Sequence, residues 1–146
     1  MVGDKTAELQ SEVNRLAEML NAPPIKVGVV LKDDDRNIYI DDDGRYHYDY
    51  WERGRQKADH VGDIDEALYW FAKDIAFDVG GSYAAVHNPR HPDSRILLWA
   101  KQNELLNRLN PCWAKRCVRE TADQLRDWGL YADVELLPDI IPERNG

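Results

Sequence analysis

The stretch RYHYDYWE, residues 45–52, decides the fold because aromatic and polar side chains alternate along it. Successive side chains of a β-strand point to opposite faces, so this strand would carry rings on both faces. Such a strand is typically central and covered on both sides, but the same composition is also enriched at protein interfaces. Both interpretations stay open at this point. One face holds Tyr46, Tyr48 and Tyr50, and the other holds His47, Asp49 and Trp51.

Two short stretches upstream have the composition of further strands. Ile25–Leu31 is rich in β-branched residues, and Asn37–Ile40 follows a polar turn made by the aspartates at 33–35. A second turn at 41–44 ends in an Asp-Gly step, which is typical of tight hairpins. Tight turns between consecutive strands imply antiparallel pairing. The sequence therefore predicts a three-stranded meander built from Ile25–Leu31, Asn37–Ile40 and Arg45–Glu52.

The segments on either side of these strands repeat at helical spacing. In residues 6–20 an apolar side chain recurs every three or four positions, and Pro23-Pro24 then excludes further helix. Downstream, Asp63 and Glu66 form a capping-box pattern before a second apolar helical repeat. The Gly80-Gly81 pair falls where that second helix is expected to end or loosen.

Two further helices are predicted between residues 93 and 129. Asp93 or Ser94 can cap the first of them, which runs to about Leu109. The second begins at Asn110-Pro111, because proline suits the first turn of a helix, and it ends near a Trp-Gly step.

Strands and helices that are segregated along the chain predict an α+β fold with helices against one sheet face. The expected order is an N-terminal helix, a three-stranded antiparallel meander, about three packed helices and an extended C-terminal tail. Residues 131–137 are expected to be a strand or an extended segment, because Pro138 and Pro142 disfavour a helix there. The length of 146 residues is typical of one domain, which we expect to span residues 1–146.

The composition narrows the function classes. A formal net charge of −8 disfavours binding to nucleic acid and to anionic membranes, and it favours rapid association with a basic partner. No apolar run approaches the roughly 20 residues that span a bilayer, and the N-terminus lacks the pattern of a signal peptide. The spacing of Cys112 and Cys117 on a helix makes a mutual disulfide unexpected. We therefore expect a cytoplasmic protein without nucleic-acid or membrane partners.

The two aspartate triplets, Asp33–Asp35 and Asp41–Asp43, were compared with a calcium-binding loop. An EF-hand loop needs glycine at its sixth position and glutamate at its twelfth. Counting from Asp33, these positions hold Ile38 and Gly44, so the pattern fails. Solvated turns are the better interpretation, and together they can present negative charge to a basic partner.

No other pattern predicts a cofactor, a metal or a catalytic group. His87 and His91 have helical spacing, but prolines surround them and no further ligand is nearby in the sequence. Cys112 lies at a predicted helix start, where a thiol can be activated, but no base is identifiable. One enzyme alternative remains, in which His47 acts with Asp49 or Glu52.

Three segments together resemble the bacterial immunity protein 63 family. They are YHYDYWERG (Tyr46–Gly54), DIDEALYWFAKDIAF (Asp63–Phe77) and DSRILLWAKQNELLNRLNPCWAKR (Asp93–Arg116). The resemblance therefore covers residues 46–116. It implies an immunity protein without chemistry of its own, encoded beside a toxin of a polymorphic or contact-dependent system and protecting the producing cell by binding that toxin.

On this basis we expect the partner to be a cognate toxin, for which a basic nuclease is one candidate. A regulatory or scaffold module that binds a peptide at a sheet edge or at the proline-containing tail is the alternative. The expected toxin-binding residues combine the acidic turns with the aromatic strand. They are Asp33, Asp34, Asp35, Asp41, Asp42, Asp43, Asp49 and Trp51.

Overall fold

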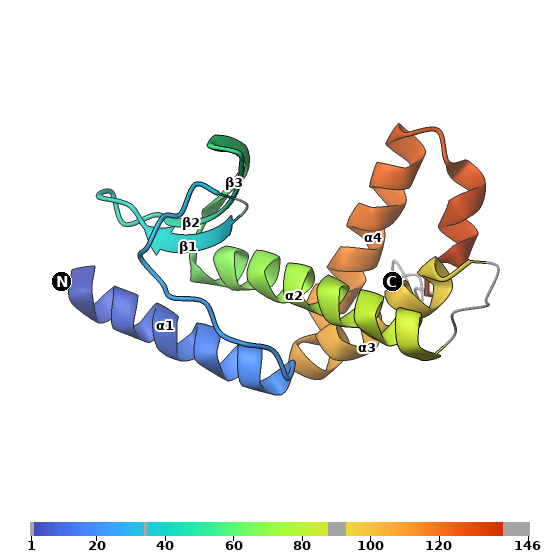
Figure 1. The fold of residues 1–146 in the computed structure, drawn as a ribbon, viewed down its shortest axis with the longest axis horizontal. Helices are drawn as coiled ribbons and strands as arrows, with labels where there is room; N and C mark the ends of the chain where they lie inside the picture. The colour runs from blue at the N-terminus through green and yellow to red at the C-terminus, as the bar shows by residue number, and fades with distance from the viewer. Residues whose placement is uncertain (1, 34, 88–92, 139–146) are drawn as a thin grey trace, which may run out of the picture. The chain divides into compact units, whose positions relative to one another are not determined.

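The computed structural model describes residues 2–33, 35–87 and 93–138. Helix α1 (Val2–Met19) is followed by strands β1 (Asp35–Ile40), β2 (Tyr46–Glu52) and β3 (Arg55–Gly62). Helices α2 (Ile64–His87), α3 (Arg95–Leu109) and α4 (Pro111–Asp127) and the short 3₁₀ helix η1 (Tyr131–Leu136) complete the order (Figure 1). The predicted α+β fold with an N-terminal helix, a three-stranded antiparallel meander and several helices is confirmed.

The chain divides into two compact units, residues 1–75 and 76–146, and α2 passes from the first into the second. The first unit contains α1, the sheet and the first half of α2. In the sheet the strand order is β1-β2-β3, and both pairs are antiparallel. None of the helices in the described ranges combines the length and the hydropathy that crossing a bilayer requires.

One predicted strand is wrong. Residues 25–31 form no strand in the structure, and the third strand is β3, a polar segment for which the sequence pattern predicted no strand. A strand is interrupted here because Gly28 has a φ of +86° and because the backbone of Leu31 hydrogen-bonds to the side chain of Asn37. β3 follows a tight turn in which Arg53 and Gly54 both have positive φ, as a two-residue hairpin turn requires.

The two faces of the sheet have different surroundings within this unit. On the face of Tyr48 the tyrosine hydroxyl donates a 2.8 Å hydrogen bond to Asp74 of α2, and His60 of β3 stacks on Trp70 of α2. Helix α1 contacts β1, and its apolar stripe is buried as its spacing predicted. That stripe consists of Leu9, Val13, Leu16 and Leu20. The opposite face, which carries His47, Asp49 and Trp51, is described below as the candidate site.

The second unit is helical, and α3 packs against α4. Its apolar cluster includes Trp99, Val118 and Leu125, and Leu137 joins it from beyond η1. The helix was expected to end or loosen at Gly80-Gly81, and it does not end there, because α2 continues to His87. Gly80 has a packing role instead, since a Cβ placed there would lie 2.7 Å from the carbonyl oxygen of Leu98.

The caps of the last two helices match the sequence closely. Asp93 accepts a hydrogen bond from the backbone N–H of Arg95, whereas Ser94 makes no side-chain cap bond. Asn110 caps α4 by accepting the N–H of Cys112. Residues 131–136 form a 3₁₀ turn where a strand or an extended segment was expected. The tail beyond Pro138, which includes Pro142, lies outside the described residues.

Candidate functional site

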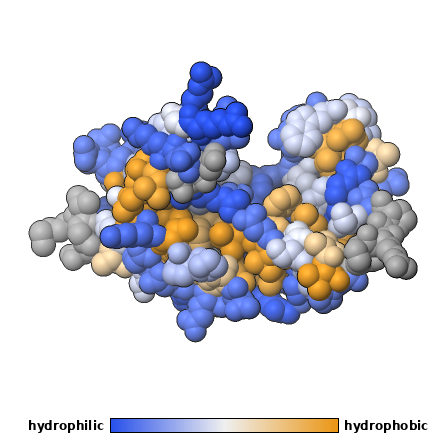
Figure 2. All heavy atoms as spheres, viewed as in Figure 1, coloured by the Kyte–Doolittle hydropathy of each residue, from blue (hydrophilic) through white to orange (hydrophobic). Residues whose placement is uncertain are grey.

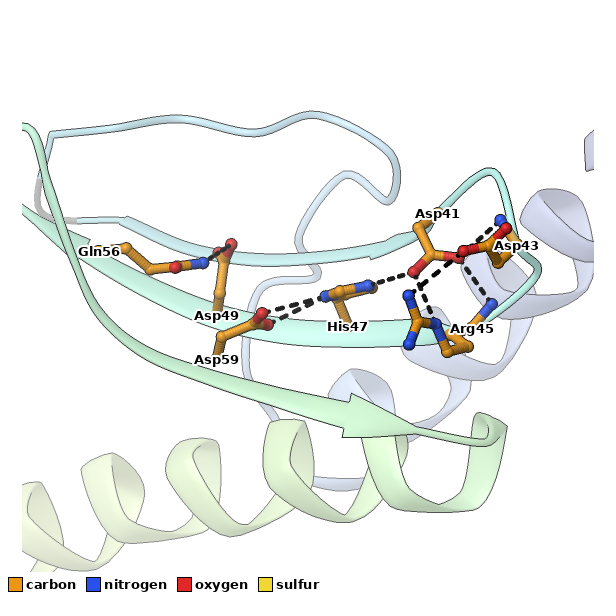
Figure 3. Close-up of polar contacts among 7 residues, drawn as sticks. All are labelled: Asp41, Asp43, Arg45, His47, Asp49, Gln56 and Asp59. Atoms are coloured by element: carbon orange, nitrogen blue, oxygen red, sulfur yellow. Dashed lines mark hydrogen bonds and ion pairs between the residues drawn. The ribbon is translucent and has the colours of Figure 1, made fainter.

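The face of the sheet that carries His47 holds a chain of linked polar side chains (Figure 3). The strand register sets Tyr39 of β1 beside His47, and it sets Asn37 and Asp59 on either side of Asp49. Alternation along three adjacent strands therefore brings these side chains to one surface. We call this set the polar row. Its members are Asn37, Tyr39, Asp41, His47, Asp49, Trp51, Gln56 and Asp59.

His47 lies between two carboxylates. Its Nε2 is 2.7 Å from Asp41 Oδ2, and its Nδ1 is 3.0 Å from Asp59 Oδ1 (Figure 3). The ring also stacks on Tyr39, with centroids 4.6 Å apart, and only 12% of the side chain is exposed. Both ring nitrogens are thus engaged, and the imidazole is held in one position.

This arrangement changes the pKa values of the groups that take part. Burial lowers the pKa of His47, but hydrogen bonds to Asp41 and Asp59 and their negative charges raise it more, so the pKa lies above its ordinary value. The hydrogen bond from His47, followed by the backbone N–H of Arg45, lowers the pKa of Asp41 to about 2. Burial, together with the charges of Asp49 and Asp59, raises the pKa of Tyr39 to about 12. The two carboxylates therefore favour the protonated form of His47.

Asp49 lies in the middle of the polar row and is buried, with 1% of its surface exposed. Its carboxylate accepts hydrogen bonds from Asn37 Nδ2 at 2.8 Å, Trp51 Nε1 at 3.1 Å and Gln56 Nε2 at 3.2 Å. A buried carboxylate with several donors is satisfied within the protein. Asp49 was expected to contact a toxin, but the structure makes it a structural residue that holds β1, β2 and β3 together.

The turn at Asp41–Gly44 separates structural from exposed carboxylates. Asp41 accepts the backbone N–H groups of Asp43 and Arg45 and pairs with the Arg45 guanidinium at 3.2 Å. Asp42 is exposed, and Asp43 is 78% exposed at its side chain, although it lies 3.3 Å from Arg45. Asp41 therefore builds the turn, while Asp42 and Asp43 present charge to solvent.

The remaining expected toxin-binding residues lie near the other end of β1 and β2. Trp51 is half-buried, its indole N–H is used by Asp49, and the ammonium of Lys32 lies 5.3 Å from its ring centroid. Asp33 is exposed, and Asp35 is the first residue of β1. Asp34 lies outside the described residues. The two aspartate triplets are therefore at opposite ends of β1.

Sequence reasoning missed Asp59, Gln56 and Tyr39. The first two belong to β3, which was not predicted as a strand, so their proximity to His47 and Asp49 could not be inferred. The period-two alternation of β3 appears in its burial, where Ala58, His60 and Gly62 are less exposed than Asp59 and Val61, and these residues show no matching alternation of apolar and polar side chains in the sequence.

The geometry does not match the enzyme alternative expected from the sequence. His47 is engaged by Asp41 and Asp59, whereas the enzyme alternative paired it with Asp49 or Glu52. A general base needs a nitrogen within reach of a substrate proton, and both nitrogens here face carboxylates. In residues 2–33, 35–87 and 93–138, no three His, Cys, Asp or Glu side chains are placed to share a metal ion. His91, half of the histidine pair considered above, lies outside those ranges.

Comparison with known proteins gives one family. The family model described as immunity protein 63 matches residues 42–123, which is more than half of the chain. The match contains the hairpin turn, β2, β3, α2, α3 and most of α4. No curated protein and no solved structure matches this chain.

Proposed function

Because the chain belongs to the immunity protein 63 family, we propose that it binds one cognate bacterial toxin in the cytoplasm of the producing cell and blocks it without chemistry of its own. The family match over residues 42–123 is the observation that carries this proposal. The hydrogen bonds of His47 support the proposal that the protein has no chemistry of its own. His47 is the best general-base candidate in the polar row, and both of its ring nitrogens contact carboxylates.

The exposed carboxylates of the hairpin turn are the proposed electrostatic part of the toxin-binding surface. Asp42 and Asp43 are exposed, and the chain carries a formal net charge of −8. Charge complementarity of this kind mainly accelerates association. Asp33 and Trp51 lie at the other end of β1 and β2 and complete the proposed surface. Asp49 is buried and is therefore left out of that surface.

A basic nuclease is the toxin class that this charge fits best. Enzymes that act on nucleic acid carry positive surfaces, because they must bind phosphate. An acidic inhibitor can occupy such a surface and compete with the nucleic acid for it. The nuclease assignment rests on charge alone and is separate from the proposal that a toxin is bound.

Co-expression tests the function directly. Bacterial cells that express the toxin domain encoded beside this gene are expected to stop growing, and this chain is expected to restore growth and to co-purify with the toxin. Rescue without a complex would contradict direct binding. A lack of both rescue and complex would favour the regulatory or scaffold alternative, whose partner would then be sought among peptides.

The acidic turn is tested with the double variant Asp42→Ser/Asp43→Ser, which keeps the structural Asp41. We expect slower toxin association and a weaker dependence of the affinity on salt, measured by surface plasmon resonance. The matched control is Asp127→Ser/Glu135→Ser, which removes the same charge from exposed positions in the second unit. Equal effects of the two variants would mean that only net charge matters and that the turn is not a contact.

A further inference from the structure

A pocket in the first unit shares Asn37 with the polar row, and its other lining residues lie outside that row. Its volume is about 500 Å³, within the range of roughly 300–1,000 Å³ that is usual for binding pockets. The segment between α1 and β1 forms one wall through Ile25, Val29 and Leu31. Phe71 and Ile75 of α2 and Tyr50 of β2 form the other. The pocket therefore has two apolar walls, one inside the family-matched residues and one outside them.

The charged residues that line this pocket are both cations. Lys26 is exposed on the segment between α1 and β1, and Arg36 enters from β1. Arg36 is held by Asp74, whose carboxylate lies 3.8 Å from its Nε and also accepts the Tyr48 hydroxyl. Arg36 nevertheless keeps 32% of its side chain exposed. The pocket lining therefore contributes Lys26 and Arg36 as its charged residues, and the charge of Arg36 is partly offset by Asp74.

The rim of the pocket is apolar and open to solvent. Leu31 is 52% exposed and Val30 is 40% exposed, although both are large aliphatic side chains. Figure 2 shows apolar side chains, in orange, gathered over the segment that joins α1 to β1. The segment is held in place, because Gln10 of α1 bonds the backbone of Ile25 and Val27, and Asn37 bonds that of Leu31. An exposed apolar rim beside an ordered pocket is typical of a protein-binding site.

We infer that this pocket receives an apolar side chain of the toxin that lies next to a carboxylate, with Lys26 and Arg36 binding the carboxylate. The inference rests on the proposed function and specifies one contact within it. Charge complementarity selects this occupant, because an apolar cavity bordered by two cations fits an apolar anchor with an adjacent anion. The wall made by residues 25–31 lies outside the family match, so this contact would be particular to the toxin of this chain.

Charge reversal at Lys26 separates this contact from the long-range attraction of the acidic turn. Lys26→Glu makes the chain two charge units more negative, and so does the control Lys115→Glu at an exposed position on α4. If the toxin is basic, general attraction makes either variant associate at least as fast as the wild type. A direct contact at the pocket instead makes Lys26→Glu bind at least tenfold more weakly, with Lys115→Glu unchanged or tighter.

Leu31→Ser tests the apolar part of the proposed contact. Because Leu31 is exposed, we expect this variant to fold as the wild type does. Circular dichroism verifies the fold of each variant. We expect at least tenfold weaker binding of the neighbouring toxin domain by isothermal titration calorimetry. If the wild type binds the toxin and both Lys26→Glu and Leu31→Ser bind it with the same affinity, the proposed pocket contact is wrong and the proposed function stands. No binding of the toxin by the wild type would overturn the proposed function, and the pocket contact with it.

Discussion

The carboxylates of Asp41 and Asp59 favour the protonated form of His47, and this preference makes the stability of the fold depend on pH. Its folded-state pKa lies above the ordinary value of 6.5, so the stabilisation is complete below that value. The stabilisation is lost as the pH rises through the folded pKa. Asp41 titrates in a separate window, because its pKa of about 2 keeps it ionised at neutral pH.

The comparison of the wild type with His47→Gln tests this dependence. We expect the wild type to have the higher Tm at about pH 5.5 and the difference in Tm to shrink toward about pH 8.5. The other histidines titrate in both proteins, so the difference isolates His47. A difference in Tm that stays constant over this pH range would contradict the stabilisation of protonated His47 by Asp41 and Asp59.

Asp49 is the residue for which burial and expected function conflict most clearly. Asp49→Ala leaves the donors of Asn37, Trp51 and Gln56 without their acceptor, so we expect a loss of about 1–3 kcal/mol in the free energy of unfolding. Urea denaturation measures it, and the exposed Asp42→Ala should stay within about 0.5 kcal/mol of the wild type. Equal stabilities of the two variants would mean that Asp49 is not a structural centre.

The polar row also shows which properties of single residues could be predicted from the sequence. Alternation in residues 45–52 correctly placed His47, Asp49 and Trp51 on one face. It could not show that Asp49 is covered, because two of the covering donors come from other strands, Asn37 of β1 and Gln56 of β3, and β3 was not predicted. Burial of a polar side chain depends on neighbours distant in the sequence, and the local pattern contains no information about them.

At the scale of elements, the helices were predictable and one strand was not. Capping residues and prolines mark helix ends locally, as Asn110 and Pro111 do for α4. Residues 25–31 have the composition of a strand, yet their backbone is partly bonded by the side chains of Gln10 and Asn37. β3 is polar and largely exposed, so its strand character comes from pairing with β2 and not from its own hydrophobicity.

The close approach of α2 and α3 at Gly80 gives a test with a built-in control. Gly80→Ala places a methyl group against the Leu98 carbonyl and is expected to cost about 1–3 kcal/mol from overpacking. In Gly81→Ala the added Cβ would lie 3.7 Å from Leu98 Cδ1, an ordinary contact, so the gain in helix propensity should stabilise by up to about 1 kcal/mol. Chemical denaturation that shows the same sign for both variants would contradict this packing.

At the scale of the whole molecule, α2 belongs to both compact units. Because a continuous helix is cooperative, we propose that residues 1–146 unfold as one domain. The length of the chain led to the same expectation, but the sequence pattern contained no sign of the division after Ile75, which arises from contacts between distant segments.

Native-state hydrogen exchange tests whether the units are coupled. Asp49→Ala lies in the first unit, and we expect it to reduce the protection of the most stable amides in β2 and in α4 by the same free energy. The unchanged exchange of Asp42→Ala is the control. Full protection of α4 in Asp49→Ala would show that the second unit folds independently.

One edge of the sheet is partly paired with the segment that precedes β1, and the other edge carries exposed cationic side chains. Beside β1, the N–H of Gly28 donates to the carbonyl of Ile38, so the preceding segment takes up part of that edge. β3 forms the other edge, and Arg55 and Lys57 are exposed there. Charged side chains on an edge strand oppose the pairing of sheets between molecules. The sheet is therefore expected to pair poorly with a second copy of itself, which disfavours aggregation through β-structure.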